Sequence, residues 1–250
     1  MKQLDGKIAI ITGAGQGIGA AIATAYAREG AKVIITGRTR EKLDAVVSAI
    51  ICEGGVALAI EARAGNRDEA RVVVGRAMAE WGRVDVLVNN AHSFTDYLPL
   101  EDLRMEEHIL IDMQSAFLGS LQLMQLCFPH MRDAGSGSII NMGSSYGIRC
   151  EPGFLAYAAS KESIRALTKT AAKEWGRLGI RVNTILPAAL SPKAVTYLEE
   201  SISYDAELAK VAIGGFGAPE PRGRSGPRRV SARVAGAEAT MAGLRRARPG

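Results

Sequence analysis

The sequence predicts an α/β protein in which helices cover both faces of a doubly wound parallel β-sheet. Three observations lead to this prediction. Short apolar runs alternate with longer helical patterns, these runs are apolar almost throughout, and a glycine-rich turn joins the first run to the first helix. At 250 residues the chain has the length of one sizeable α/β domain.

Six strands are expected, because six runs of strand length are rich in Ile, Val and Leu. They are Lys7–Thr12, Lys32–Gly37, Val56–Glu61, Val84–Asn89, Ser138–Met142 and Arg181–Leu186. Between them, apolar residues recur at helical spacing. The expected helices are Gly17–Glu29, Arg40–Glu53, Arg67–Trp81, Leu100–Arg132 (continuous or broken) and Tyr157–Leu178.

Composition narrows the class of protein. The apolar runs have the length of strands and not of membrane spans, and the first residues lack the pattern of a signal peptide, so we expect a cytoplasmic protein with no membrane partner. Three scattered cysteines and three isolated histidines predict neither a disulfide framework nor a metal site. The net charge is +5, but residues 221–250 carry eight arginines and one glutamate, which leaves −2 for residues 1–220.

The glycine run Thr12-Gly13-Ala14-Gly15-Gln16-Gly17-Ile18-Gly19 follows the first strand and enters the first helix. Glycines permit a tight turn, and the helix N-terminus offers N–H groups to a pyrophosphate, as in Rossmann-type folds. The spacing is not a strict G-x-G-x-x-G, so a glycine-rich turn without a ligand is the alternative. Its place between strand and helix favours nucleotide binding.

The end of the second strand bears on the choice of cofactor. An acidic side chain there would bind the ribose diol of NAD, whereas arginine accommodates the 2′-phosphate of NADP. Here Gly37 removes the carboxylate and Arg38 supplies positive charge. The alternative is an arginine-rich helix surface without a ligand. NADP is therefore favoured, and NAD is the second choice.

Tyr157 and Lys161 form a Tyr-x-x-x-Lys pair, with Ser144 thirteen residues upstream. Side chains at i and i+4 lie on one helix face, where an ammonium would lower the tyrosine pKa from about 10 toward working pH. The serine hydroxyl would then hold a substrate oxygen beside this acid. Each residue has an ordinary alternative: a half-buried aromatic, a solvated charge and a turn residue. Together the three residues favour a catalytic role over these alternatives.

With these residues in view, the chain resembles the short-chain dehydrogenase/reductase family, in particular its 3-oxoacyl-carrier-protein reductase-like group, from about Lys7 to Glu220. Five motifs occur in the family's order. They are Thr12-Gly13-x-x-x-Gly17-x-Gly19, Asp85-Val86-Leu87-Val88-Asn89-Asn90-Ala91, Ile139-Ile140-Asn141-Met142-Gly143-Ser144-Ser145, Tyr157-Ala158-Ala159-Ser160-Lys161 and Ile180-Arg181-Val182-Asn183.

The resemblance implies an NADP(H)-dependent oxidoreductase acting on a small carbonyl or secondary alcohol, assembled as a homotetramer or dimer. It implies catalytic roles for Ser144, Tyr157, Lys161 and Asp112, with Tyr157 as the proton donor and acceptor. It also implies a set of cofactor-binding residues. These are Gly13, Gly15, Gln16, Gly17, Ile18, Gly19, Arg38, Thr39, Arg63, Asn90, Ala91, Tyr157, Lys161 and Pro187.

The chain departs from the family pattern at several of these positions. His92 stands where the family has glycine, and its imidazole either crowds or shapes the site or points outward. Asp112 replaces a helix asparagine of the proton relay; the main-chain carbonyl remains, and the carboxylate would strengthen the charge of Lys161. Arg63 replaces an aspartate that meets the adenine, and lies either near the nucleotide or on the surface. Pro187-Ala188 replaces Pro-Gly beneath the nicotinamide.

After Glu220 the family's seventh strand and closing motifs do not occur. Residues 221–250 are instead rich in Arg, Gly, Ala and Pro, a composition that buries little. We therefore divide the chain into a catalytic domain, 1–220, and an atypical tail, 221–250, and hypothesise a change of reading frame. Translation of the other two frames tests this hypothesis. Without its seventh strand the sheet would have an open edge.

Two other function classes compete with the enzyme. One is a nucleotide-binding protein with impaired or no turnover, in which the changes at His92, Asp112 and the tail have disabled catalysis. The other reads the arginine-rich tail as an arm for nucleic acid. No aromatic residue is interleaved with those arginines, so we expect no nucleic-acid partner. Aromatic residues at 92–99, 146–156 and 188–215 predict an apolar or aromatic-tolerant substrate pocket.

Overall fold

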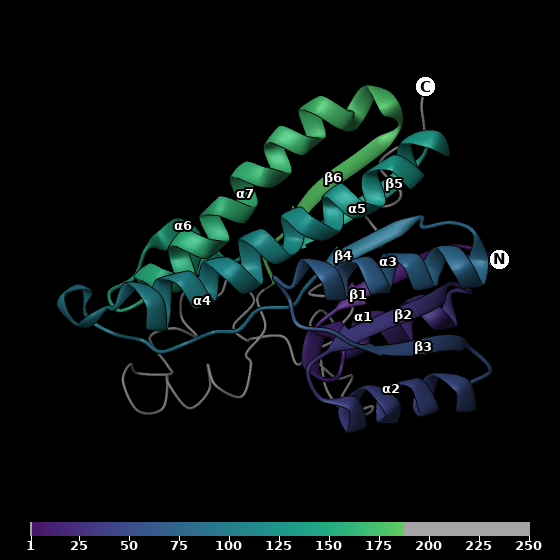
Figure 1. Cartoon of the computed structure of the whole chain (residues 1–250), viewed down its shortest axis with the longest axis horizontal. Helices are drawn as coiled ribbons and strands as arrows, with labels where there is room; N and C mark the ends of the chain where they lie inside the picture. The colour runs from purple at the N-terminus through teal and green to yellow at the C-terminus, as the bar shows by residue number, and fades with distance from the viewer. Residues whose placement is uncertain (1, 188–250) are drawn as a thin grey trace, which may run out of the picture.

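The fold is a three-layer α/β sandwich, described for residues 2–187 by a computed structural model. Six parallel strands form one sheet in the order β3-β2-β1-β4-β5-β6 (Figure 1). This order is that of a doubly wound sheet, and its reversal point lies between β1 and β4. The strands are β1 Ile8–Thr12, β2 Lys32–Gly37, β3 Val56–Glu61, β4 Val86–Asn89, β5 Gly137–Met142 and β6 Ile180–Ile185.

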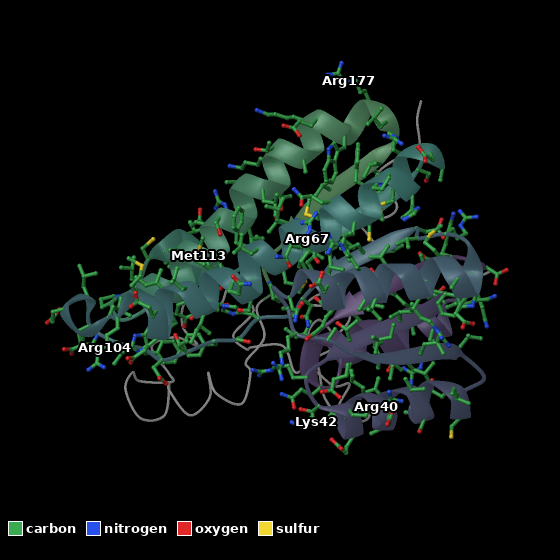
Figure 2. All side chains as sticks on the ribbon, in the orientation of Figure 1. Arg40, Lys42, Arg67, Arg104, Met113 and Arg177 are labelled. Carbon is green, nitrogen blue, oxygen red and sulfur yellow. The ribbon has the colours of Figure 1, made fainter. Side chains whose placement is uncertain are left out.

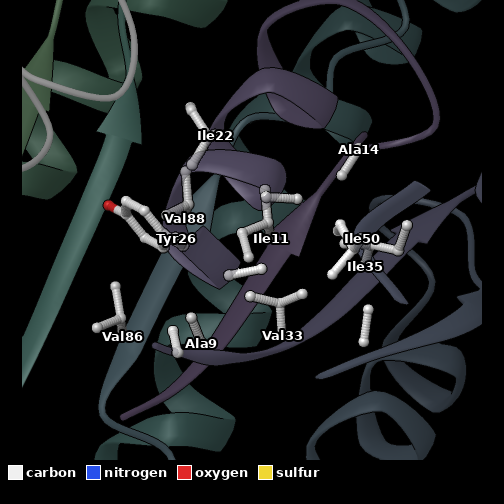
Figure 3. Close-up of a cluster of buried hydrophobic side chains, with 14 of the residues drawn as sticks. Ala9, Ile11, Ala14, Ile22, Tyr26, Val33, Ile35, Ile50, Val86 and Val88 are labelled. Atoms are coloured by element: carbon white, nitrogen blue, oxygen red, sulfur yellow. The ribbon is translucent and has the colours of Figure 1, made fainter. Parts of the chain in front are cut away.

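Helices cover both faces of the sheet, as the sequence predicts. Side chains of α1 (Gly17–Arg28) and α2 (Arg40–Cys52) pack on one face, and those of α3 (Arg67–Trp81), α5 (Gly119–Asp133) and α7 (Leu155–Trp175) pack on the other. On the first face Tyr26 of α1 lies among Ile22, Val86 and Val88 (Figure 3). Apolar side chains pack in one cluster on each face of the sheet, and every residue of β1, β4 and β5 is buried between them.

The long expected helix Leu100–Arg132 is broken. A short 3-10 turn, Leu100–Asp102, is followed by π-helical Met105–Ile109, α4 (Leu110–Met113), π-helical Gln114–Leu118 and then α5. One short helix was not predicted from the sequence. It is α6 (Ser145–Arg149), whose N-cap is Ser144. The remaining elements are confirmed with shifts of one or two residues at their ends, and the last expected helix ends in a 3-10 turn, Gly176–Leu178.

Buried amides join the strands at the edge of the sheet where the site lies. Asn89 at the end of β4 donates from Nδ2 to Asn141 Oδ1 on β5 at 2.8 Å. Asn141 in turn donates to Thr168 Oγ1 on α7 at 2.9 Å. Because unpaired amides cost free energy in a dry interior, these bonds fix the register of β4, β5 and α7. They position α7, which carries Tyr157 and Lys161.

No helix of residues 2–187 combines the length and apolarity needed to cross a membrane. The sequence-based expectations for the tail, the seventh strand and the pocket residues Tyr197 and Tyr204 fall outside the described residues.

Candidate active site

The glycine turn after β1 is held against the segment after β4. The Thr12 hydroxyl accepts from the backbone N–H groups of Asn90 and Ala91, both at 2.9 Å, and Asn90 Nδ2 donates to the carbonyl of Thr12 at 2.9 Å. Gly13 has a φ of +64°, and a Cβ there would lie 2.8 Å from Ala91 Cα. Gly19 is equally tight, because its Cβ would meet Asn90 Nδ2 at 2.6 Å. The glycines are therefore required by the turn itself.

The N-terminus of α1 is open, unlike that of α3. The Gln16 side chain makes no capping hydrogen bond to α1, and the first turn has no acidic residue. Among the described residues, no atom lies within 4 Å of a Cβ built on Gly17. In contrast, Asn66 caps α3 by accepting from two backbone N–H groups, and two acidic residues follow it. Free N–H groups and a positive helix end fit a pyrophosphate, so this turn can hold the cofactor that the sequence predicts.

Positive side chains flank the turn from β2 and α2. Arg38 and Thr39 are exposed just after β2, and Thr39 is the N-cap residue of α2. Lys42 donates from Nζ to Gln16 Oε1 at 2.6 Å, so its charge lies beside the glycine turn. Figure 2 places Arg40 and Lys42 together on the first turn of α2. Arg40 is already paired with Asp44 at 2.9 Å.

The other expected cofactor residues lie along the same edge of the sheet. Arg63 follows β3; its side chain is exposed, its backbone N–H donates to Glu69, and it lines a small cavity together with Thr12. Ala91 follows β4. Pro187 follows β6. The end of β6 is held to the segment after β5 by a 2.8 Å hydrogen bond from the Gly143 N–H to the Ile185 carbonyl. Ile18 is half-buried in the first turn of α1.

Ser144, Tyr157 and Lys161 meet at the carboxyl end of β5. Ser144 caps α6 by accepting from the Tyr146 N–H at 3.2 Å. Lys161 is 5% exposed, donates from Nζ to the Met142 carbonyl at 3.0 Å, and lies with Nζ 5.6 Å from the centre of the Tyr157 ring. The structure thus brings together the trio that the sequence predicts to be catalytic.

The protonation states differ from the expectation. Burial raises the pKa of Tyr157, against a smaller lowering by its hydrogen bond with Ser144, and the charge of Asp112 raises it further. Burial lowers the pKa of Lys161 to about 8, against the opposing effect of Asp112. The sequence predicts a lowered Tyr157 pKa, but in the ligand-free chain the net shift is upward, with burial as its largest cause.

Asp112 lies behind this trio and is fully buried. Its Oδ2 accepts from the Thr95 hydroxyl at 2.8 Å and from the Thr95 N–H at 3.3 Å. The helix is π-helical on both sides of α4, a distortion common at functional sites. The carboxylate raises the pKa of Lys161, as the sequence predicts.

His92 points into the site and not outward. Its side chain is 10% exposed, Nε2 lies 2.6 Å from Asp112 Oδ1, and the ring centre is 5.1 Å from that of Tyr157. The two polar atoms are close but not in line for a full hydrogen bond. Burial, together with the charge of Lys161, lowers the pKa of His92 to about 4, so the imidazole is neutral at neutral pH.

Aromatic rings surround Tyr157 and form what we call the aromatic cluster. Its ring-to-ring distances run from 4.3 Å (Tyr97–Phe154) to 6.3 Å (Phe154–Tyr157). Tyr146 stacks on Phe154 at 4.5 Å. The members of the aromatic cluster are Phe94, Tyr97, Tyr146, Phe154 and Tyr157. The aromatic residues in the described part of the expected substrate region thus gather around Tyr157.

Two site residues were missed from the sequence. Lys42 lies in the first turn of α2, four residues after Arg38, and this spacing was the available signal. Thr95 carries no motif, because its role depends on a loop folding back onto α4. Among residues 2–187, no group of three or more acidic, His or Cys side chains could hold a metal ion.

Replacing Ser144 with Ala is expected to raise the pKa of Tyr157 further, by about one unit, because the hydrogen bond that stabilises the phenolate is lost. The phenol then persists to higher pH. Absorbance titration of the ligand-free chain, with Tyr157→Phe subtracted, measures the midpoint. Ser145→Ala changes the exposed neighbour and serves as the matched control. An unchanged midpoint in Ser144→Ala would contradict the assigned contact.

Comparison with known proteins agrees with this geometry. A family model described as short chain dehydrogenase matches residues 7–202. The chain is 37% identical to a 12alpha-hydroxysteroid dehydrogenase of Clostridium sp., with 86% of each chain covered. It is 34% identical to a 3-oxoacyl-acyl-carrier-protein reductase of Thermotoga maritima, with 87% of each covered.

A solved structure has the same fold. The crystal structure of a metagenomic short-chain oxidoreductase in complex with NADP superposes with a TM-score of 0.71 at 32% identity. The alignment covers 85% of this chain and 94% of that one. The doubly wound fold predicted from the sequence is confirmed.

Proposed function

The chain belongs to the short-chain dehydrogenase/reductase family of oxidoreductases, and from that premise we propose that it transfers a hydride between NADP(H) and a carbonyl or secondary alcohol, with Tyr157 as the proton donor and acceptor. The observation that carries the proposal is the gathering of Ser144, Tyr157 and Lys161 beside an open glycine turn. These groups come from β5, α7 and the β1–α1 turn, and they share one edge of the sheet.

The residues divide the work of carbonyl reduction. The Ser144 hydroxyl binds the carbonyl oxygen and the Tyr157 hydroxyl gives it a proton, so that charge developing on that oxygen is neutralised. When bound, the reduced nicotinamide supplies the hydride to the carbonyl carbon, and its oxidised form carries a positive charge. Lys161, as an ammonium, stabilises the phenolate that remains. Oxidation of an alcohol runs through the same groups in reverse.

The aromatic cluster supports an apolar or aromatic-tolerant substrate. Its rings lie beside Tyr157 and would pack against flat apolar groups next to the carbonyl. Incubation with NADPH and a panel of aliphatic, alicyclic and aryl ketones, followed by the loss of NADPH absorbance, tests the proposal. Oxidation of NADPH with none of these ketones would count against it.

A binding protein with little turnover is the second candidate, and one observation favours it. With no ligand bound, burial raises the pKa of Tyr157 and lowers that of Lys161, so the pair is poorly prepared to form a phenolate. Reduction needs the phenol and not the phenolate, so this observation weighs against alcohol oxidation more than against ketone reduction. Tight NADPH binding without turnover on the ketone panel would select the second candidate.

We also propose a homo-oligomer, either a tetramer or a dimer. Large apolar side chains are exposed on the segment that leads into α4 and on α4, α6 and α7, an arrangement that fits burial against a second copy. These residues are Leu100, Met105, Leu110, Ile111, Ile148 and Leu155, all at least 43% exposed. Sedimentation of the chain as a monomer at micromolar concentration would contradict this proposal.

Tyr157→Phe is expected to lower kcat for ketone reduction by about 10²-fold or more, because the proton donor is removed. The dissociation constant for NADPH should stay within about twofold, since the ring remains. Steady-state kinetics and fluorescence titration measure the two quantities. Tyr97→Phe, which changes a second member of the aromatic cluster, should retain turnover. Near-normal kcat in Tyr157→Phe would refute the role of Tyr157.

Arg38→Ala and Lys42→Ala are each expected to weaken NADPH binding by about tenfold and to change NADH binding little, because only NADPH carries the 2′-phosphate. Comparing the two dissociation constants for each variant measures the selectivity. Arg177→Ala is the matched control, since Arg177 is exposed at the far end of α7 (Figure 2). A wild-type chain that binds NADH more tightly than NADPH would overturn the cofactor assignment.

A further inference from the structure

His92 and Asp112 form a buried pair that lies directly against Tyr157. Asp112 is fully buried on α4, and Nε2 of His92 is 2.6 Å from its Oδ1. The imidazole ring also approaches Phe94, at 6.4 Å between ring centres. Since the ring covers one side of Tyr157, the pair belongs to the surroundings of the proton donor.

The loop that carries His92 is held at two further points, one on α4 and one on the π-helical turn Gln114–Leu118 that follows it. The Ser93 N–H donates to Ser115 Oγ at 2.9 Å, and that hydroxyl donates to the Ile111 carbonyl at 3.0 Å. Thr95 donates twice to Asp112, from its backbone and from its hydroxyl. These bonds leave the His92 ring little freedom to swing away from Asp112 and Tyr157.

The electrostatic effect of the pair comes from Asp112, whose negative charge acts on both Tyr157 and Lys161. A neutral imidazole that faces a carboxylate keeps its proton on the facing nitrogen, so Nε2 carries the hydrogen and Nδ1 is the acceptor. Lys161 is the neighbouring cation that opposes protonation of His92.

The pair affects the ionisation of Tyr157 in two ways, and both oppose it. The negative charge of Asp112 opposes ionisation of the phenol. The His92 ring excludes water from the Tyr157 side chain, and a phenolate loses more by dehydration than a phenol does. Both effects favour the protonated tyrosine.

We propose that His92 and Asp112 act as a positioning pair that holds Tyr157 in its protonated, donor form and so favours carbonyl reduction over alcohol oxidation at neutral pH. This inference rests on the proposed function for its consequence, but its physical content concerns the ligand-free chain. In the family that the sequence resembles, glycine and asparagine usually occupy these two positions, so the pair is a departure from the usual family pattern.

The titratable groups around the pair are few within the described residues. Tyr157 and Lys161 face it from α7. Arg149 and Glu151, in and after α6, pair with each other at 3.3 Å. Asp96, in the same loop as His92, is exposed. Asp112 is therefore the charge whose removal tests the proposal.

The first measurement uses the unmodified chain without ligand. Nitrogen-15 NMR of the imidazoles, assigned with His92→Gln and His108→Gln, reports the tautomer and the titration of each histidine. We expect His92 to be neutral, with the proton on Nε2, down to about pH 5. A His92 that titrates in the ordinary range near pH 6.5, or that carries its proton on Nδ1, would overturn the pair.

The second measurement follows the ionisation of Tyr157 by absorbance, with the matching Tyr157→Phe chain subtracted each time. Asp112→Asn preserves the shape of the side chain and should lower the Tyr157 midpoint by about one pH unit. His92→Gly admits water and should lower it as well, whereas His92→Gln fills the space and should leave it near the wild-type value. His130→Gln is the matched control, because His130 lies in the last turn of α5, several helical turns along the chain from Asp112.

The outcomes separate this inference from the proposed function. If Asp112→Asn and His92→Gly leave the Tyr157 midpoint unchanged, the pair has no such role, even in an active reductase. If the midpoints shift in a chain with no turnover, the pair stands and the proposed function fails. In an active chain, Asp112→Asn should also lower the pH at which the rate of alcohol oxidation reaches half its maximum, by the same shift as the Tyr157 midpoint. Circular dichroism checks that the variant keeps the wild-type fold.

Discussion

The hydrogen bonds between Thr12 and the segment after β4 are the constraint on which the rest of the site depends. One hydroxyl accepts from two successive N–H groups, at Asn90 and Ala91, and thereby fixes the end of β4 against the glycine turn. The same step fixes the start of the loop that carries His92. The hydrogen bonds to the Thr12 hydroxyl, at the reversal point of the sheet, therefore position both the open N-terminus of α1 and the His92 ring beside Tyr157.

Burial of charge is the second physical theme of this site. Lys161 and Asp112 are both nearly inaccessible, and each would be costly alone. Lys161 is compensated by the Met142 carbonyl, and Asp112 by Thr95. Because these partners are backbone or neutral groups, the charge of Asp112 still acts on both Tyr157 and Lys161. The same dehydration that strengthens their effect also resists formation of the phenolate.

The sequence predicted the sheet, the approximate strand ends and the meeting of Ser144, Tyr157 and Lys161, because those depend on local periodicity and on motif spacing. It did not decide the direction of His92, since that depends on the loop after β4 being tied to α4 through Ser93 and Thr95. It also predicted the wrong sign for the pKa of Tyr157. Spacing along a helix shows that Lys161 is near, but it contains no information about how much water the fold removes from the phenol.

The two departures from the family pattern at His92 and Asp112 explain each other. An imidazole at position 92 beside a helix asparagine would be buried next to Lys161 without an anionic partner. If position 92 were glycine, a carboxylate at position 112 would keep its hydrogen bonds with Thr95, but its Oδ1 would face the space that the His92 ring now fills. Together, the histidine fills that space and the carboxylate supplies its partner at 2.6 Å. Residues in contact in this way are energetically coupled, so the pair is one change in the surroundings of Tyr157 and not two.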